Sequence, residues 1–235
     1  AAGWGDDLAV QPLNPRLPKR TRPRQTDPMS LLEVIALHAD DARRAEEGGA
    51  DRIELLGTLA EDGMSPEPEQ VEWARRATSI QIRPIVRLRP GFRTDGGEFV
   101  RLKGLIASYL DAGADGVVFG FLNGHAGIDL EVCGALVSDG DWPWTFHRAV
   151  DHCLDLDDAW EALLTLPRLD QVLTAGSVRG VEHGLEDLLR LARDPRVASL
   201  MMAGGGLHPE HVPWLVRAGV RSFHIGSPAR PGGSY

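Results

Sequence analysis

The sequence predicts an α/β protein, a (β/α)8 TIM-like barrel, on three observations. Similar phrases recur at 49–55, 113–119 and 219–225, where a glycine ends a helical stretch and an apolar, β-rich run follows at once. Glycine adopts the left-handed conformation at a helix end without steric cost, so each phrase predicts a helix-to-strand turn. Eight apolar runs alternate with helical patterns, and 235 residues suit one large barrel domain.

The elements are expected in regular alternation within a domain at 29–235. Apolar, β-rich runs predict strands at 31–37, 51–56, 81–88, 115–121, 143–149, 170–174, 197–203 and 220–226. Helical patterns between them predict helices at 39–48, 67–78, 97–112, 129–138, 155–165, 182–193 and 208–218. The helix that would follow the eighth strand is missing from the sequence. We therefore expect an N-terminal arm, a partner subunit or a segment beyond the given sequence to cover that flank.

Residues 1–28 are expected to form an extended arm and not a domain. The segment holds five prolines and a cluster of five basic residues, at positions 16, 19, 20, 22 and 24. Basic residues without interleaved aromatic side chains bind nucleic acid weakly, so we favour a leader segment over a nucleic-acid-binding arm.

The charge and cysteine content exclude several classes of function. A net charge of −9 and a pI near 5.4 give no global basic field that would attract nucleic acid or an anionic membrane. No apolar run approaches the roughly 20 residues that span a bilayer. Cys133 and Cys153 form no CxxC pair, which excludes a disulfide framework and a thiolate zinc site of the usual spacing. We expect a cytoplasmic protein, in which any anionic ligand requires a local basic pocket.

Charged residues share one face of each of the first three predicted strands. Period-two alternation places them there: Glu33, Arg52, Glu54, Arg83, Arg87 and Arg89. Buried charges are costly without partners, so we expect the two glutamates to meet the arginines of the third strand. A structural ion-pair layer is the favoured interpretation for Arg52 and Arg83, near strand starts. Ligand binding is favoured for Arg87 and Arg89, at the carboxyl end where barrels carry their active sites.

The segment 145–153 places a polar cluster at the carboxyl end of the fifth strand. His147 suits proton transfer or metal ligation, Arg148 suits a carboxylate or phosphate, and Asp151 suits orientation of either. The alternative is that His147 is a satisfied core residue and that Arg148 pairs with Asp151. His152 and Cys153 could extend this cluster into a metal site, although two residues adjacent in sequence do not easily reach one tetrahedral ion. The candidate metal ligands are His147 and Cys153.

Small residues follow the last two strands. Gly204, Gly205 and Gly206 come after the seventh strand, and Ser227 comes after the eighth. Loops at these places often bind phosphate in barrels of this kind, so a phosphate seat is predicted, with a tight turn as the alternative. The sequence has no Walker loop, GxSxG elbow or HExxH motif, which leaves nucleotide hydrolysis, elbow-serine and zincin chemistry without support.

Several segments together resemble the copper homeostasis protein CutC family over about residues 30–228. They are 32–34, 49–55, 83–89, 145–151, 173–176 and 202–206, in the order of the family's own motifs. The resemblance implies a TIM-like barrel, often dimeric, in the cytosol, with a name that refers to copper tolerance. Many members carry cysteines just after the positions of Glu33 and Glu54. Ile35, Ala36 and Leu56-Gly57 stand there instead, which argues against direct Cu(I) binding.

Two functional hypotheses follow, and a third is structural. The resemblance implies a cytosolic homodimer associated with copper homeostasis, with copper as its one suggested cofactor and Met201, Met202, His147 and Cys153 as its only soft ligands. The alternative is a barrel enzyme of the lyase, aldolase or isomerase kind that acts on a small phosphorylated or carboxylated metabolite. Its predicted catalytic residues are Glu33, Glu54, His147 and Asp151. Its predicted ligand-binding residues are Arg52, Arg87, Arg89, Arg148, Gly204, Gly205, Gly206 and Ser227. The third hypothesis is an interaction scaffold completed by a partner.

Overall fold

The predicted barrel is confirmed by the computed structural model, which describes residues 30–226. Eight parallel strands run in the described part of the chain: β1 (Leu31–Ala36), β2 (Arg52–Leu55), β3 (Gln81–Pro84), β4 (Val117–Phe119), β5 (Trp144–Phe146), β6 (Leu169–Thr174), β7 (Met201–Ala203) and β8 (Ser222–Ile225). They pair in the order β3-β2-β1-β8-β7-β6-β5-β4. A parallel bridge between Ile85 and Val118 joins the two ends of this order, and the Val86 amide donates to the Val118 carbonyl at 2.7 Å. The sheet therefore closes on itself.

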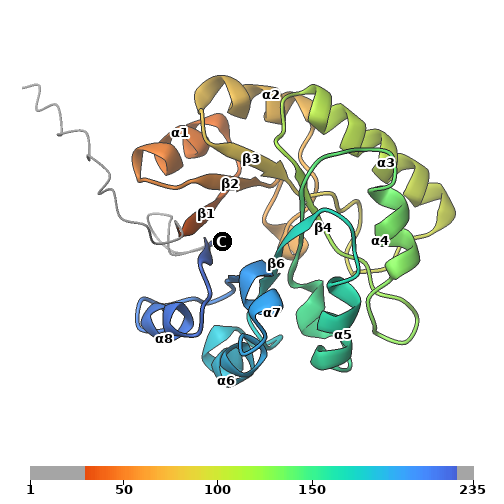
Figure 1. Cartoon of the computed structure of the whole chain (residues 1–235). Helices are drawn as coiled ribbons and strands as arrows, with labels where there is room; N and C mark the ends of the chain where they lie inside the picture. Colours follow the sequence, from red (N-terminus) through yellow and green to blue (C-terminus); the bar gives the residue numbers. More distant parts are fainter. Residues whose placement is uncertain (1–29, 227–235) are drawn as a thin grey trace, which may run out of the picture.

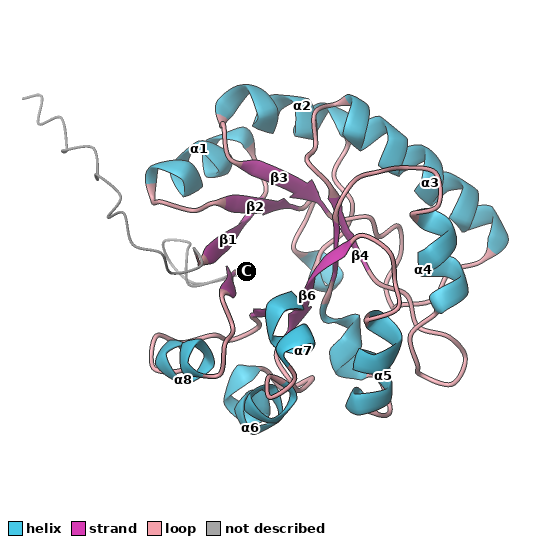
Figure 2. Ribbon diagram, viewed as in Figure 1, coloured by secondary structure: helices cyan, strands magenta, loops and turns pink. Residues whose placement is uncertain are grey.

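Helices surround the strands on the outside of the barrel (Figures 1 and 2). They are α1 (Ala39–Glu47), α2 (Pro68–Ala77), α3 (Gly96–Asp111), α4 (Leu130–Leu136), α5 (Leu156–Leu163), α6 (Val181–Leu191), α7 (Pro195–Leu200) and α8 (Val212–Arg217). Leu102, Trp160 and Leu188 from these helices join Ile53 and Val172 from the strands in one buried hydrophobic cluster. The main core thus lies between the sheet and its helical layer. None of the helices in residues 30–226 combines the length and the apolar character of a membrane span.

The repeated glycine turns are confirmed by their backbone angles. Gly49, Gly113 and Gly219 have φ values of 90°, 98° and 100°, in the region that glycine enters without a Cβ clash. Each ends a helical segment and leads into the next strand. These three turns lead into β2, β4 and β8, as the predicted alternation of helix and strand requires.

The prediction of a seventh strand over 197–203 is wrong in its first half. Residues Pro195–Leu200 form the short helix α7, and β7 begins only at Met201. Asp194 accepts a hydrogen bond from the Arg196 amide at 2.8 Å, and Pro195 occupies the first turn. An aspartate before a proline is a helix start signal, and it overrides the apolar run that follows. All seven predicted helices are present besides α7, the last of them shortened to Val212–Arg217.

The predicted partners of the buried glutamates are also wrong. Glu33 and Glu54 do not meet the arginines of β3, because Glu33 pairs with Arg52 on the adjacent strand and Glu54 lies near His224 of β8. Arg83 instead reaches across the barrel to Asp170 of β6. Both buried arginines form ion pairs, Arg52 with the buried Glu33 and Arg83 with the partly exposed Asp170, as the structural interpretation predicts. The proline-rich arm at 1–28 and the flank beyond β8 lie outside the described residues.

Candidate functional site

A cavity of about 820 Å³ opens at the carboxyl end of the strands. Its wall comes from the ends of β2 and β8 and from the segments after β3, β5, β6 and β7. The polar side chains that line it are Glu54, Glu61, Arg87, His147, Arg148, His152, Arg179 and His224. Active sites of barrel enzymes occupy this end, so the cavity is the candidate functional site.

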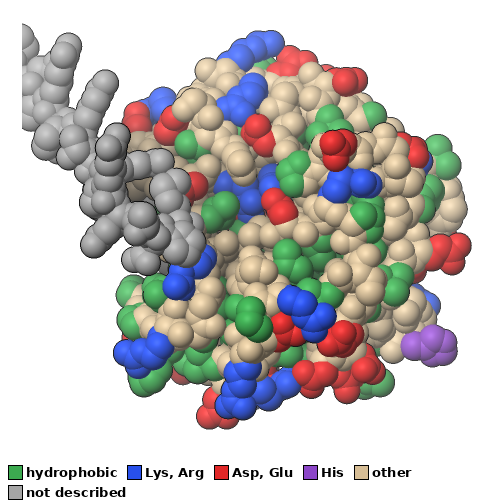
Figure 3. All heavy atoms as spheres, viewed as in Figure 1, with side chains coloured by type: hydrophobic (Ala, Val, Ile, Leu, Met, Phe, Trp, Pro, Cys, Tyr) green, Lys and Arg blue, Asp and Glu red, His purple; other side chains and the backbone are tan. Residues whose placement is uncertain are grey.

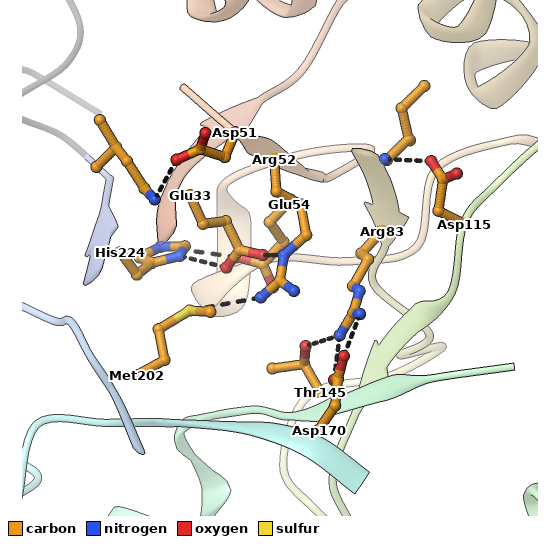
Figure 4. A network of polar contacts seen from close by, with 12 residues as sticks. Glu33, Asp51, Arg52, Glu54, Arg83, Asp115, Thr145, Asp170, Met202 and His224 are labelled. Atoms are coloured by element: carbon orange, nitrogen blue, oxygen red, sulfur yellow. Dashed lines mark hydrogen bonds and ion pairs between the residues drawn. The ribbon is translucent and has the colours of Figure 1, made fainter. Parts of the chain in front are cut away.

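Four charged or titratable side chains form a buried network beneath and beside this cavity (Figure 4). Arg52 Nε donates to Glu33 Oε2 at 2.5 Å, and His224 Nδ1 lies 2.8 Å from Glu33 Oε1. His224 Nε2 lies 3.8 Å from Glu54 Oε2. Strand register explains the assembly, since Glu33 is paired with both Arg52 and His224 on the strands that flank β1. We call these four residues the relay cluster.

The two glutamates of the relay cluster have opposite pKa shifts. Burial alone would raise the pKa of Glu33, but the Arg52 guanidinium and the His224 hydrogen bond outweigh burial and hold it at about 2. Burial raises the pKa of Glu54 to about 7, with Glu33 adding to the rise and His224 and Arg52 opposing it. Glu33 is therefore a fixed anion at neutral pH, while Glu54 titrates near neutrality.

His224 belongs to the same titrating system as Glu54. Burial would lower the pKa of His224, but its hydrogen bond with Glu33 and the charges of Glu54 and Glu33 raise it above its ordinary value. Arg52 Nη2 also contacts Met202 Sδ at 3.8 Å, a second contact for the guanidinium besides Glu33. Two carboxylates thus face one arginine, and the charge balance of the cluster depends on a proton held by Glu54 or His224.

His147 enters the cavity as a neutral hydrogen-bond donor. The Ala149 amide donates to its Nδ1 at 3.2 Å, so the ring hydrogen resides on Nε2. Burial, together with the nearby Arg87 charge, lowers the pKa of His147 to about 3. Phe92 packs edge-on against this ring at 5.5 Å between centroids and also contacts His152. A neutral imidazole at this place can donate to a ligand oxygen without accepting a proton.

Arg148 is held in place by a carboxylate and by backbone. Its Nε donates to Asp151 Oδ2 at 2.8 Å and its Nη2 donates to the Ser177 carbonyl at 3.1 Å. Asp151 in turn accepts from the Thr174 hydroxyl at 2.6 Å and from the Ala175 amide. The expected alternative, a pairing of Arg148 with Asp151, is present, and Arg148 lines the cavity as well. Asp151 itself is buried beneath it.

The two arginines after β3 have different positions. Arg87 lines the cavity, donates to the carbonyls of Glu61, Gly63 and Gly91, and lies 5.2 Å over the Phe92 ring. Arg89 is 46% exposed and pairs with Glu98 at 3.0 Å and with Asp95 at 3.2 Å. The structure therefore brings Arg87 to the cavity and leaves Arg89 on the surface, since two acidic residues at the start of α3 attract it.

The glycine loop after β7 meets the cavity at two of its three positions. Gly205 and Gly206 line it, with φ values of 85° and 77°. The Gly205 backbone packs on Arg148, because a Cβ at Gly205 would lie 2.7 Å from the Arg148 Cζ. Gly204 lies behind the wall, against Leu173 and His224. Ser227 lies outside the described residues.

Among the described residues, neither His147 nor Cys153 belongs to a group of three His, Cys, Asp or Glu ligands close enough to hold one metal ion. Cys133 is fully buried, and burial raises the pKa of its thiol to about 12; burial raises the pKa of the Cys153 thiol to about 11. In residues 30–226, three side chains bring ligand atoms within 4.8 Å of one another, as a metal site requires: Glu33, Glu54 and His224. These are oxygen and imidazole donors, and Glu33 is already committed to Arg52.

Sequence reasoning did not assign a role to His224, Phe92 or Arg179. His224 lies on the inward face of β8, one residue before the end of that strand, a position that strand alternation could have identified. Arg179 lies in the turn before α6, with an exposed side chain that lines the cavity. Phe92 lies in the loop after β3, and no periodic signal marks it. The face shown in Figure 3 carries acidic and basic side chains intermingled, without a broad basic patch.

Comparison with known proteins gives a consistent result. The CutC family profile matches residues 30–228. Proteins named family protein CutC from Klebsiella pneumoniae subsp. pneumoniae and Yersinia pseudotuberculosis are each 34% identical over 201 residues, which cover 83% of this chain and 79% and 78% of theirs. A crystal structure from Streptococcus agalactiae, titled as a copper homeostasis protein CutC, superposes with a TM-score of 0.75 at 24% identity, over 84% of this chain and 98% of that one. A structure titled as a lyase/mutase from Burkholderia cenocepacia has a TM-score of 0.60 at 17% identity, over 86% and 78%, and shows the fold alone.

Proposed function

Because this chain belongs to the CutC family, we propose that it serves copper homeostasis by binding a small anionic molecule in the barrel cavity, not by holding Cu(I). One observation carries the proposal: Arg87, Arg148 and Arg179 all line a single cavity at the carboxyl end of the strands. Arginine presents a planar fork of donors to carboxylates and phosphates. His147 adds a neutral donor to the same wall.

The donor chemistry does not fit Cu(I). This ion prefers thiolate and thioether ligands, and the chain has two cysteines, of which Cys133 is fully buried. Neither cysteine belongs to the group of ligand atoms formed by Glu33, Glu54 and His224 in the described residues. Met202 Sδ contacts the Arg52 guanidinium at 3.8 Å, and that guanidinium also pairs with Glu33 of the group. A cation there would meet a positive charge.

A copper titration tests the proposal that the protein does not bind Cu(I). Purified full-length protein competes anaerobically for Cu(I) against a chromophoric chelator, beside a Cys133→Ser, Cys153→Ser double variant. We expect no competition from either protein. Tight one-to-one binding that the double variant loses would contradict the proposal and restore a thiolate copper site.

A second experiment tests the proposal that the cavity binds a small anion. Thermal stabilisation of the protein is measured with inorganic phosphate, pyruvate and dihydroxyacetone phosphate, for the wild type and for Arg148→Met and Arg89→Met. Arg89 is the matched control, since it is a loop arginine in ion pairs outside the cavity. We expect Arg148→Met to weaken binding roughly tenfold or more, as loss of a charged hydrogen bond does, and Arg89→Met to leave it unchanged. Equal loss in both variants would place the anion elsewhere.

A barrel enzyme acting on such an anion is the second candidate. It is favoured by the position of Glu54, which lines the cavity with a pKa near 7 beside His224. Titratable groups with displaced pKa values in a cavity are typical of acid–base sites. The cytoplasmic homodimer that the family resemblance implies stays a prediction, which sedimentation velocity and cell fractionation would test.

A further inference from the structure

A carboxylate, Glu54, and a neutral imidazole, His147, both line the cavity, and the proposed anion binding assigns no role to Glu54. Glu54 is the last residue but one of β2 and lines the cavity, and His147 follows β5 and lines it from another part of the barrel. The arginines Arg87, Arg148 and Arg179 line the same space. This inference rests on the proposed function, because it requires an anion held by those arginines.

Glu54 has the geometry of a general base. Its carboxylate is 4% exposed, has no guanidinium within ion-pair distance, and faces His224 Nε2 at 3.8 Å among the described residues. Glu33, by contrast, is locked to Arg52 at 2.5 Å and does not line the cavity. Of the two buried glutamates, Glu54 is thus the one with a free oxygen that a substrate can approach.

The rest of the relay cluster orients this base. Arg52 fixes Glu33, Glu33 fixes His224 through Nδ1, and His224 directs Nε2 at Glu54. A carboxylate that holds the far nitrogen of an imidazole sets which nitrogen faces the reacting group. Arg52, Glu33 and His224 are therefore positioning residues for Glu54.

His147 complements the base, because it donates a hydrogen bond to a ligand and does not take up a proton. With Nδ1 occupied by the Ala149 amide, Nε2–H is the atom available to a ligand oxygen. A neutral imidazole that donates to a carbonyl oxygen stabilises the negative charge that develops there when a neighbouring C–H is deprotonated.

We propose that the cavity catalyses proton abstraction from a carbon next to the carbonyl of a small anionic substrate, with Glu54 as the base and His147 as the donor to the carbonyl oxygen. The C–H bond breaks and its proton moves to a Glu54 oxygen. The electron pair forms a carbon–carbon double bond, and the carbonyl electrons move to the oxygen, as an enolate that His147 Nε2–H stabilises. The proton, or one exchanged from solvent, then returns to the same carbon as the carbonyl re-forms, so the step requires no oxidant or co-reactant. Substrates of this class are 2-oxo acids and phosphorylated ketones.

Solvent exchange tests this chemistry directly. The full-length protein is incubated in D2O with pyruvate, 2-oxoglutarate or dihydroxyacetone phosphate, and loss of the C–H signal is followed by proton NMR. We expect exchange above the buffer rate for at least one probe, and a loss of roughly 100-fold or more in Glu54→Gln. Glu98→Gln is the matched control, since Glu98 is a buried carboxylate paired with Arg89 outside the cavity. It is expected to exchange like the wild type.

Binding is measured on the same samples, so that the two proposals fail separately. A probe that stabilises the fold of both wild type and Glu54→Gln, but exchanges in the wild type alone, supports the inference. Stabilisation by inorganic phosphate, with no exchange of any carbonyl probe, overturns the inference and leaves the proposed anion binding intact. Exchange that persists in Glu54→Gln overturns the role of that residue.

The positioning role of His224 is tested by a separate measurement, the dependence of the exchange rate on pH. The groups that face Glu54 are His224 on β8, Glu33 on β1 and Arg52 on its own strand. The rate is expected to rise with pH as Glu54 ionises. The His224 charge lowers the pKa of Glu54, so His224→Asn is expected to move the rising limb to higher pH. A lower rate at every pH, with an unmoved limb, would mean that His224 is merely structural.

Discussion

Two polar clusters built around buried arginines lie in this barrel, and they differ in how their charges balance (Figure 4). In the first, Arg83 donates both Nη atoms to Asp170, at 2.5 and 2.6 Å, and donates to the Thr145 hydroxyl at 2.8 Å. One cation meets one anion, and none of the three residues lines the cavity. We call these three residues the Arg83 cluster.

The relay cluster has the same ingredients in another proportion. Two carboxylates face one arginine there, and a histidine completes the balance only when a proton is present. Its outer members, Glu54 and His224, reach the cavity. The difference teaches that a buried arginine–carboxylate pair stabilises a barrel when its charges cancel, and becomes a titratable site when one carboxylate is left over at the cavity wall.

Removal of the arginine is expected to cost most in the relay cluster. Arg52→Met leaves the Glu33 carboxylate fully buried without its cation, and loss of one partner from a buried pair costs about 3 to 5 kcal/mol. Urea denaturation measures the free energy of unfolding. Glu33→Gln with Arg52→Met removes both charges and is expected to recover a large part of the loss. A double variant no more stable than Arg52→Met would show that the stranded charge is not the cause.

The equivalent change in the Arg83 cluster is expected to cost less. Asp170 is 41% exposed at its side chain, so water can hydrate it once Arg83→Met removes the guanidinium. The remaining cost is the loss of charged hydrogen bonds, about 2 kcal/mol. The same denaturation experiment compares the two variants. Equal losses for Arg83→Met and Arg52→Met would mean that burial of the partner carboxylate does not distinguish the clusters.

The two clusters are also expected to differ in how they make the free energy of unfolding depend on pH. Glu54 has a pKa of about 7 in the folded protein, against an ordinary value of 4.5. Its contribution to the free energy of unfolding is therefore fully present below pH 4.5 and is lost as pH rises through 7. His224, whose pKa is also raised, acts in the same direction. The stability of the wild type relative to Glu54→Gln is therefore expected to fall with rising pH, by at most about 1.4 kcal/mol per pH unit.

Thr145→Val is the control for this experiment, because it alters the Arg83 cluster without removing a titrating group. Its difference from the wild type is expected to stay constant with pH. His147 has a lowered pKa and acts in the opposite direction, but it is present in every protein compared and cancels. A constant difference for Glu54→Gln would contradict the titratable character of the relay cluster.

The barrel was predictable from sequence because its signals are local. Glycine turns, apolar runs and helical periods each depend on a few adjacent residues, and the alternation they predict is the one observed. The strand over 197–203 failed for a local reason as well, since the helix start at Asp194 and Pro195 was not weighed against the apolar run. The burial of Glu33, Arg52 and Arg83 followed from strand parity.

The partners inside the site were not predictable in the same way. The alternation of side chains along a strand predicts which face of the sheet a side chain lies on. The strand register and the closure of the barrel decide which residue it contacts. His224 lies 191 positions from Glu33 in the chain, and only the pairing of β8 with β1 brings them together. Arg89 shares its parity with Arg87, yet the acidic residues of α3 attract it to the surface. Long-range pairing therefore limits what sequence can state about the site.

The smallest expected effect comes from the glycine loop after β7, where Gly205 and Gly206 line the same cavity as Glu54 and Arg148. Gly205→Ala and Gly206→Ala bear the same backbone strain, since both residues have positive φ. A Cβ at Gly205 would meet the Arg148 guanidinium at 2.7 Å, whereas a Cβ at Gly206 meets nothing within 4 Å. Gly205→Ala is therefore expected to cost about 1 kcal/mol more than Gly206→Ala, the scale of one typical hydrogen bond weakened as Arg148 shifts.

Anion binding sharpens this last comparison. Because Arg148 must move to admit the Gly205→Ala methyl group, that variant is expected to bind phosphate more weakly than Gly206→Ala, by about tenfold for a loss near 1.4 kcal/mol. Isothermal titration of both variants measures the ratio. Equal affinities would show that Arg148 contributes no anchoring to the anion, and the cavity's positive charge would then act through Arg87 and Arg179, which lie on other parts of its wall.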